Sequence, residues 1–290
     1  MAPTRLYLGV DGGGSVTRAR LEDSAGRVLG AGEAGPGNLR LGARTAWQAV
    51  SAAMRGALAE AGLQDSALAQ IEAGLGMAGA WVDEARTAFL GEPSPFARLV
   101  LESDAHAACL GAHAGAPGAV VIVGTGSVGH VWDGRTGREV GGWGFPIGDG
   151  GSGAWIGFEA VRNAAAAADG LGDRSALGDA VLAQIGGGRS AAVVWAGRAE
   201  PADYAALAPL VLQHAAAGDH AALGIMYAAG AQISRLVQAT AGSGGIPVAI
   251  VGGLAGPILP WLDAATRSRL VPPKGNALDG ALRMIRTTAA

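Results

Sequence analysis

Two short glycine-rich stretches of this sequence each carry a hydroxyl group and resemble one another. The first is Asp11-Gly12-Gly13-Gly14-Ser15 and the second is Gly124-Thr125-Gly126-Ser127. They align without a gap, and the same offset places Val28 on Val140. Each follows an apolar run and precedes another strand-like segment, which predicts a β-hairpin whose tip exposes backbone N–H groups. Such tips hold phosphate oxygens, so the pair predicts a duplicated domain that binds a nucleoside triphosphate between two lobes.

Asp104 stands where a catalytic carboxylate is expected. It follows the apolar run Leu99–Leu101 and precedes a segment that favours a helix from about Ala105. In open α/β sheets, ligands bind at this carboxyl end of a strand. A carboxylate there can accept the proton of a hydroxyl that is being phosphorylated. The alternative is that Asp104 only caps the helix that follows.

Asp11 opens the first glycine-rich turn. Next to bound phosphates, its carboxylate can anchor Mg²⁺ directly or through water. The alternative is a purely local role, because Asp-Gly pairs are common in hairpin turns. The position of Asp11 inside a repeated motif favours the metal-binding interpretation.

Three other positions have a functional and a local interpretation. Asp149, in the flexible stretch Gly148–Gly153, is suited to bind hydroxyl groups of a polyol, and Ser152 beside it is a candidate helix cap. Gly252-Gly253 follows a predicted strand and lets a flat ring such as adenine approach, or forms a tight turn. Asn38 lies in a Gly-Pro-Gly turn, where Asn tolerates a left-handed conformation.

Alternating strands and helices must position these residues, and they predict an α/β fold. The first lobe is expected over 1–116 and the second over 117–290, with a hinge-like turn at Gly115–Gly118. The terminal helix can return to the first lobe. The predicted strands are Leu6–Val10, Thr17–Glu22, Val28–Glu33, Ile71–Gly76, Leu99–Leu101, Ala119–Val123, Val128–Asp133, Arg138–Gly142, Pro247–Val251 and Arg269–Val271. The predicted helices are Thr45–Ala61, Trp81–Leu90, Ala105–Ala114, Gly153–Ala168, Leu177–Ile185, Tyr204–Ala215, Ala221–Ala241, Pro257–Ala264 and Ala277–Arg286.

Composition excludes several classes of protein. The net charge is −3 and Lys274 is the only lysine among scattered arginines, so no basic surface for nucleic acid is expected. No apolar run approaches the roughly 18–20 residues that span a bilayer. The single cysteine, Cys109, excludes a disulfide framework and a multi-thiolate zinc site, and the five histidines lack metal-ligand spacing. We therefore expect a cytoplasmic protein that binds neither nucleic acid nor membranes.

The motifs, in this order and with Gly252-Gly253-Leu254 near the end, resemble the actin, chaperone and sugar-kinase superfamily. Within it the chain is similar to the BadF/BadG/BcrA/BcrD ATPase family, on the branch of glucosamine and N-acetylglucosamine kinases. The stretches Asp104–His113 and Phe145–Ile147 resemble bacterial glucosamine kinases. The resemblance implies two actin-like (ribonuclease H-like) lobes, each with a mixed sheet flanked by helices, and a nucleotide cleft between them.

The resemblance also implies roles for particular residues. Asp104 would be the general base. ATP and its phosphates would be bound by Asp11, Gly12, Gly13, Gly14, Ser15, Gly124, Thr125, Gly126, Ser127, Gly252 and Gly253. The sugar would contact Asn38, Gly79, Asp104 and Asp149, and Mg²⁺ would be held near Asp11.

The implied activity is ATP- and Mg²⁺-dependent phosphorylation of the 6-hydroxyl of glucosamine, with N-acetylglucosamine as the alternative substrate. Animal N-acetylglucosamine kinases have Glu after the loop Asp where this chain has Gly150, which favours the free amine. Trp143, among glycines, favours the acetylated sugar. Two other classes fit less well: dehydratase-activating ATPases use two cysteines per chain, and sugar-responsive regulators need a DNA-binding segment. A homodimer is an open option.

Overall fold

The computed structural model describes residues 5–242 and 244–287 of the chain. Contacts divide these residues into two compact units that interleave along the sequence. Unit 1 contains the residues up to Val120, the segment His130–Arg138 and the residues from Pro272 onwards. Unit 2 contains Val121–Gly129 and Glu139–Val271. The functional division at residue 116 stays a prediction.

Unit 1 contains a five-stranded mixed sheet in the order β3-β2-β1-β4-β5. Strands β1, β2 and β3 form an antiparallel meander, whereas β4 and β5 run parallel to β1. The carboxyl ends of β1, β4 and β5 therefore meet at one edge of the sheet. The strands are β1 (Leu6–Gly12), β2 (Thr17–Asp23), β3 (Val28–Ala34), β4 (Ile71–Met77) and β5 (Arg98–Ser103), in agreement with the predicted segments.

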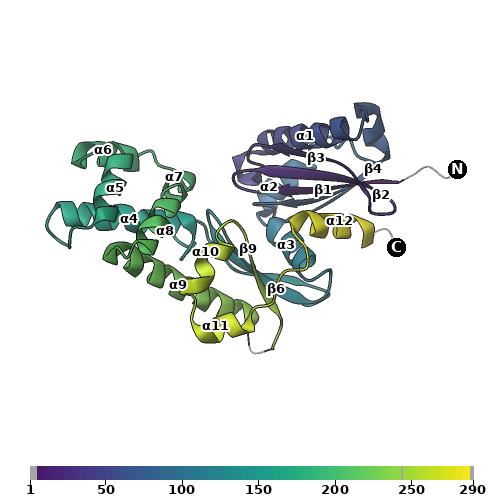
Figure 1. Cartoon of the computed structure of the whole chain (residues 1–290). Coiled ribbons are helices and arrows are strands. Elements are labelled where there is room, and N and C mark those ends of the chain that lie inside the picture. The colour runs from purple at the N-terminus through teal and green to yellow at the C-terminus, as the bar shows by residue number, and fades with distance from the viewer. Residues whose placement is uncertain (1–4, 243, 288–290) are drawn as a thin grey trace. The chain divides into compact units, whose positions relative to one another are not determined.

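Helices cover both faces of this sheet (Figure 1). Helix α1 (Ala43–Glu60) packs on one face, where Leu8 and Val10 of β1 join its buried stripe. Helices α3 (Asp104–Ala112) and α12 (Ala277–Thr287) pack on the other face, where a Cβ on Gly9 would lie 2.7 Å from Leu282 Cγ. The remaining helices of unit 1 are η1 (Leu39–Leu41), η2 (Asp65–Gln70) and α2 (Asp83–Leu90).

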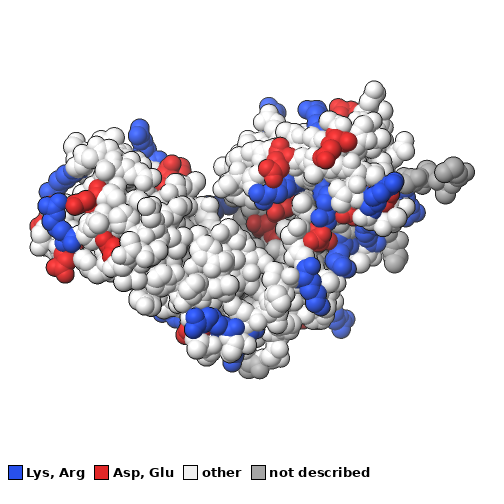
Figure 2. Space-filling view, viewed as in Figure 1, with Lys and Arg blue, Asp and Glu red and all other residues white. Residues whose placement is uncertain are grey.

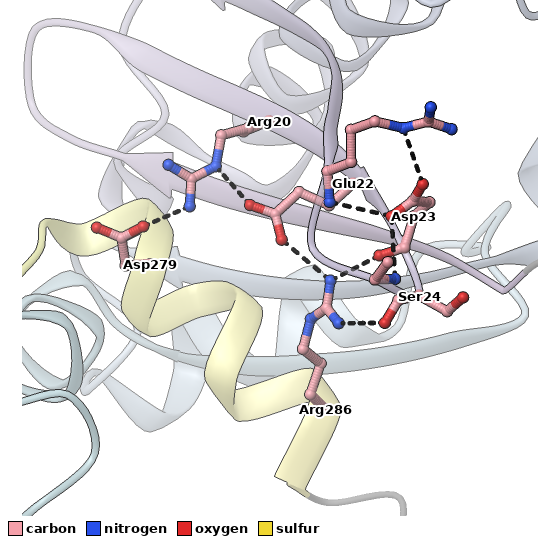
Figure 3. A network of polar contacts seen from close by, with 8 residues as sticks. Arg20, Glu22, Asp23, Ser24, Asp279 and Arg286 are labelled. Carbon is pink, nitrogen blue, oxygen red and sulfur yellow. Dashed lines mark hydrogen bonds and ion pairs between the residues drawn. The ribbon is translucent and has the colours of Figure 1, made fainter.

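A network of charged side chains ties α12 to β2 (Figure 3). Glu22 is buried and contacts two arginines, Arg20 Nε at 3.0 Å and Arg286 Nη2 at 3.0 Å. Arg20 also reaches Asp279 at 2.5 Å, and the Arg286 guanidinium lies 4.3 Å from the centre of the Tyr7 ring. Buried charges need such compensation, so the network fixes the position of the terminal helix on the sheet.

The second sheet repeats the strand order of the first. Its order is β8-β7-β6-β9, which corresponds to β3-β2-β1-β4. The strands are β6 (Gly118–Val123), β7 (Ser127–Trp132), β8 (Gly137–Gly141) and β9 (Val248–Val251). The two glycine-rich turns follow β1 and β6, so they occupy the same place in the two motifs, as the aligned sequences predict.

Apart from the parts of the second sheet that belong to it, unit 2 is helical, and several predictions here were wrong. The segment Arg189–Ala196 forms a helix that was not predicted. The segment predicted as one helix from Tyr204 to Ala215 is two, α7 and α8. The predicted strand Arg269–Val271 forms only an isolated bridge from Leu270 to Val248. The helices of unit 2 are α4 (Gly153–Ala168), α5 (Ala176–Gln184), α6 (Arg189–Ala196), α7 (Pro201–Ala205), α8 (Ala208–Ala216), α9 (His220–Ala241), α10 (Ala255–Ile258), η3 (Leu259–Trp261) and α11 (Ala264–Arg269).

A proline and a capping aspartate account for part of these differences. Pro209 stands in the first turn of α8, where its missing N–H and fixed φ favour a helix start. The predicted helix Pro257–Ala264 is replaced by α10, η3 and α11, because the chain turns between Leu259 and Asp263. Asp263 then caps α11 by accepting a hydrogen bond from the Thr266 N–H at 2.6 Å.

On the face shown in Figure 2, basic and acidic side chains lie close to one another, and a broad area between them is uncharged. None of the helices in the described residues is both long and apolar enough to cross a lipid bilayer.

Candidate functional site

Asp104 is the first residue of α3, directly after β5, and it is not the cap of that helix. The cap is Ser103, whose Oγ accepts a hydrogen bond from the His106 N–H at 3.1 Å. Asp104 Oδ1 accepts the N–H of Ala105 at 2.9 Å. Since a neighbouring serine caps the helix, capping does not explain the aspartate. Asp104 is half-buried and follows the carboxyl end of β5, which is where open α/β sheets generally bind ligands.

Asp11 lies on the same face of that sheet, near Asp104. In the register of the parallel strands, Asp11 pairs with Gly76 of β4, and Gly76 pairs with Glu102 of β5. An ideal Cβ on Gly76 would lie 3.6 Å from the Cα of Asp104 and would clash with Ala107. Glycine at position 76 therefore lets α3 approach the sheet. Asp11 and Asp104 lie on either side of Gly76.

The environment of Asp11 suits a cation. Burial raises the pKa of its carboxyl group above the ordinary value, and the nearby Arg18 offsets only part of this effect. A bound divalent ion would stabilise the ionised form of such a carboxylate. No group of three or more acidic, histidine or cysteine side chains suited to a metal occurs in the described residues. Mg²⁺ at Asp11 would therefore need phosphate and water oxygens as its other ligands, which is usual for this ion.

The first glycine-rich turn is held by backbone bonds on one side and open on the other. Gly13 donates its N–H to Val16 O at 3.0 Å and accepts that of Gly37 at 3.0 Å. Gly14 and Ser15 are exposed, and a Cβ on Gly14 would meet no atom within 4 Å. The tip of the turn thus has room for a phosphate group beside its N–H groups.

Asn38 and Gly79 lie together near the same edge. The Asn38 side chain caps η1 by accepting the Arg40 N–H at 2.9 Å. Its φ of −65° and ψ of 124° are extended, so the left-handed conformation predicted for it was wrong. Gly79 has a φ of +81°, and a Cβ there would lie 2.7 Å from Asn38 Oδ1. Glycine is required at 79 because the Asn38 carboxamide occupies the space beside it.

In unit 2, Asp149 contacts the second glycine-rich turn. Its Oδ1 accepts the N–H of Ser127 at 3.0 Å, and Ser127 Oγ donates to Gly150 O at 3.2 Å. Asp149 adopts a φ of +62°, which is unusual for a residue other than glycine. The aspartate predicted to bind sugar therefore also orders the loop predicted to bind phosphate.

The start of α4 supports the carbonyl side of that turn. Gly153 and Ala154 donate their N–H groups to Gly124 O at 2.8 Å and Thr125 O at 3.0 Å. Ser152 caps the helix, as predicted, by accepting the Trp155 N–H at 3.2 Å. Among the described residues, the N–H groups of Thr125 and Gly126 donate to no backbone carbonyl, and N–H groups of this kind can donate to phosphate oxygens.

The two glycines after β9 have different surroundings. Gly252 has a φ of +103°, and a Cβ there would clash with the carbonyl of Val123 on β6. The close approach of β6 therefore explains why residue 252 is a glycine, as the tight-turn interpretation predicts. Gly253 has no atom within 4 Å of its Cβ position. Only Gly253 leaves open space of the kind that a flat ring could use.

A pocket of about 340 Å³ in unit 2 includes residues that sequence reasoning missed. Its lining contains Asp149 and Ser127 together with Gln232 and Arg235 of α9. A Cβ on Gly150 would lie 3.1 Å from Gln232 Oε1, so the Gln232 carboxamide fills the space beside this glycine. Both α9 residues lie within a regular helical pattern, and no signal in the sequence distinguishes them from other surface positions.

Comparison with known proteins decides the family. The model of the BadF/BadG/BcrA/BcrD ATPase family matches residues 8–259. The chain belongs to the BadF/BadG/BcrA/BcrD ATPase family. It is 35% identical over 276 residues to the glucosamine kinase GspK of Vibrio cholerae, covering 95% of this chain and 94% of that protein. It is 30% identical over 187 residues to the N-acetylmuramic acid/N-acetylglucosamine kinase of Clostridium acetobutylicum, covering 61% of this chain and 59% of that protein.

Solved structures share the fold of this chain. A Chromobacterium violaceum protein whose name proposes N-acetylglucosamine kinase activity is 40% identical, with a TM-score of 0.92 over 97% of this chain and 99% of that one. The glucokinase of the ROK family from Streptomyces griseus, solved with glucose and AMPPNP, is 18% identical, with a TM-score of 0.57 over 97% of this chain and 99% of that one. The fold is therefore actin-like, with two mixed sheets flanked by helices, as the resemblance implied.

Proposed function

We propose that this protein transfers the γ-phosphoryl group of ATP to the 6-hydroxyl of D-glucosamine. As a member of the BadF/BadG/BcrA/BcrD ATPase family, it is an ATP-binding protein. Its relatives over nearly the full length are named as kinases of amino sugars, which supports a phosphotransferase with a sugar hydroxyl as acceptor.

One observation carries the mechanism: Asp104 lies beside Gly76 at the edge of the sheet where Asp11 and the first glycine-rich turn also lie. Asp104 would accept the proton of the sugar hydroxyl as its oxygen attacks the γ-phosphorus. The N–H groups of the two turns would bind the charged phosphate oxygens. Mg²⁺ at Asp11, when bound, supplies additional charge stabilisation of the phosphates.

Asn38, Gly79 and Asp149 are the proposed sugar contacts. Glucosamine is favoured because GspK, the relative that aligns over 95% of the chain, is named a glucosamine kinase. The absence of a side chain at Gly150 is in line with this preference. The amine of the sugar is largely cationic near neutral pH and favours acceptors such as the Asn38 carboxamide oxygen.

N-acetylglucosamine is the second candidate, and one observation favours it. The side chain of Trp143 is 76% exposed, although a residue of this size is usually buried. An exposed indole can form the apolar surface against which an acetamido methyl group packs.

Product analysis tests the reaction. The purified protein is incubated with MgATP and glucosamine, and the product is examined by ³¹P and ¹³C NMR. We expect a phosphate ester on C6 and one ADP per ester. An ester on C1, or ADP release without any ester, would contradict the proposed reaction.

A further inference from the structure

A half-buried histidine, His106, and a buried one, His130, form a pair close to the proposed base. His106, on the first turn of α3, and His130, on β7, are both in unit 1. His106 Nδ1 and His130 Nε2 are 3.2 Å apart, and the rings meet edge to face with centroids 5.2 Å apart. The Trp132 ring packs against His106 at 4.9 Å. A Cβ on Gly137 would lie 2.9 Å from His130 Cε1, so a bare backbone borders the His130 ring.

The partners of the two rings determine where the protons lie. A hydrogen bond between the two nitrogens requires one N–H and one lone pair. His130 Nδ1 is buried and has no hydrogen-bond partner among the described residues. A buried N–H without a partner is costly, so His130 carries its proton on Nε2 and donates it to His106 Nδ1. Burial, and then the proximity of His106, lower the pKa of His130 to about 4, which keeps this ring neutral.

This bond fixes the part of α3 that carries Asp104. The backbone of His106 is already held by Ser103 Oγ, immediately before Asp104. The His130 bond adds a restraint on the side chain of His106, two residues after Asp104. Asp104 therefore lies between two anchored residues, and its Oδ1 is oriented by the Ala105 N–H.

We propose that His130 is a positioning residue for Asp104, acting through the hydrogen bond from its Nε2–H to His106 Nδ1. This role rests on the proposed function, because Asp104 must be the base for its placement to affect the rate. Displacement of a reacting group by even about 1 Å can cost roughly 100-fold in rate. A small shift of the α3 first turn should therefore lower kcat and leave nucleotide binding intact.

Two variants of His130 separate this role from simple support of the fold. His130→Gln keeps an N–H donor near the position of Nε2, whereas His130→Leu removes it. Activity is measured per folded molecule, well below the melting temperature of each variant. We expect His130→Leu to lower kcat by roughly 10-fold with the KM for ATP within about twofold of wild type, and His130→Gln to recover most of the loss. Unchanged kcat in folded His130→Leu would overturn the proposal.

The positions of the protons on the two histidines can be tested without an activity assay. A long-range ¹H–¹⁵N spectrum of the imidazole groups at pH 7 should show His130 protonated on Nε2 with a lone pair on Nδ1. A proton on Nδ1 would overturn the proposal even if the enzyme is an active kinase. If the wild-type protein shows no sugar-dependent ADP release, both the proposed function and the positioning role are wrong. The spectrum tests the hydrogen bond between the two histidines independently of that result.

Discussion

Asp11 and Asp104 lie on the same face of the unit 1 sheet, on either side of Gly76. Register places Asp11 opposite Gly76 on the neighbouring strand, and the missing side chain of Gly76 allows the Asp104 backbone to approach within 3.6 Å of the ideal Cβ position. Both aspartates therefore lie at the carboxyl ends of the parallel strands, where ligands bind in open α/β sheets.

Substitution of Asp104 should abolish most of the turnover. We expect Asp104→Asn to lower kcat by roughly 100-fold or more, the scale of losing a general base, with ATP affinity nearly unchanged in a calorimetric titration. Asp83→Asn is a matched control, because Asp83 is also an aspartate at the first position of a helix, α2, and is exposed. Comparable kcat values in the two folded variants would remove Asp104 from the base role.

The Asp11 carboxylate should lower the stability of the ligand-free protein at pH 7 and raise its activity with MgATP. Burial raises its pKa in the folded state, so the unfolded chain loses this proton at lower pH than the folded protein does. Stability contributed by the protonated form is therefore present below about pH 4 and is lost as pH rises through the folded-state value. At pH 7 we expect Asp11→Asn to raise the melting temperature of the ligand-free protein and to lower kcat/KM for MgATP by roughly 10-fold or more. A lower melting temperature at pH 7, with full activity, would refute both parts.

The two glycines after β9 should respond differently to alanine. Gly252→Ala places a methyl group against Val123 O at a positive φ, so we expect a loss of roughly 1–3 kcal/mol in the free energy of unfolding. Gly253→Ala meets open space and should change stability by less than about 0.5 kcal/mol, while raising the KM for ATP if adenine packs there. Urea unfolding and ATP kinetics of both variants provide the measurement. Equal destabilisation by the two changes would contradict the local geometry.

The charged network on α12 should contribute more than an exposed ion pair. Glu22→Gln weakens two buried contacts, to Arg20 and Arg286, and we expect it to cost roughly 1–3 kcal/mol. Glu33→Gln is the control, because Glu33 pairs with Arg18 at an exposed site and should cost less than about 1 kcal/mol. Urea unfolding of both variants measures the difference, and a Glu22→Gln protein as stable as the control would show that the network does not hold the terminal helix.

The sequence predicts most of the elements because their patterns are local. The short, nearly continuous apolar run of β1 is typical of a central strand that is buried on both faces, and the buried stripe of α1 follows the helical period of 3.6 residues. Helix α6 was not predicted because its apolar residues form the continuous run Ala191–Ala196, which shows no spacing of 3.6 residues, and none of them is buried. The isolated bridge at Leu270 could not be distinguished from a strand, because its apolar residues are the same and only pairing decides.

The sequence predicts the motifs of the candidate site, but it does not predict which of their residues contact one another. Asp104 and the two glycine-rich turns stand out because their residue types follow apolar strands. By contrast, the bond from Ser127 to Asp149 and the approach of Gln232 to Gly150 join segments far apart in the chain. The pairing of His106 with His130 is of the same kind, since their spacing in the sequence matches no metal-binding pattern.

The most direct test of the account is the ADP-release rate over a panel of sugars at fixed MgATP. Glucosamine, N-acetylglucosamine, glucose and N-acetylmannosamine are each titrated to obtain kcat/KM, with Asp104→Asn as the inactive control. We predict the highest value for glucosamine and a ratio to N-acetylglucosamine above one. A ratio clearly below one would replace the proposed substrate by the acetylated sugar, and the absence of sugar-dependent ADP release with every sugar would contradict the kinase itself.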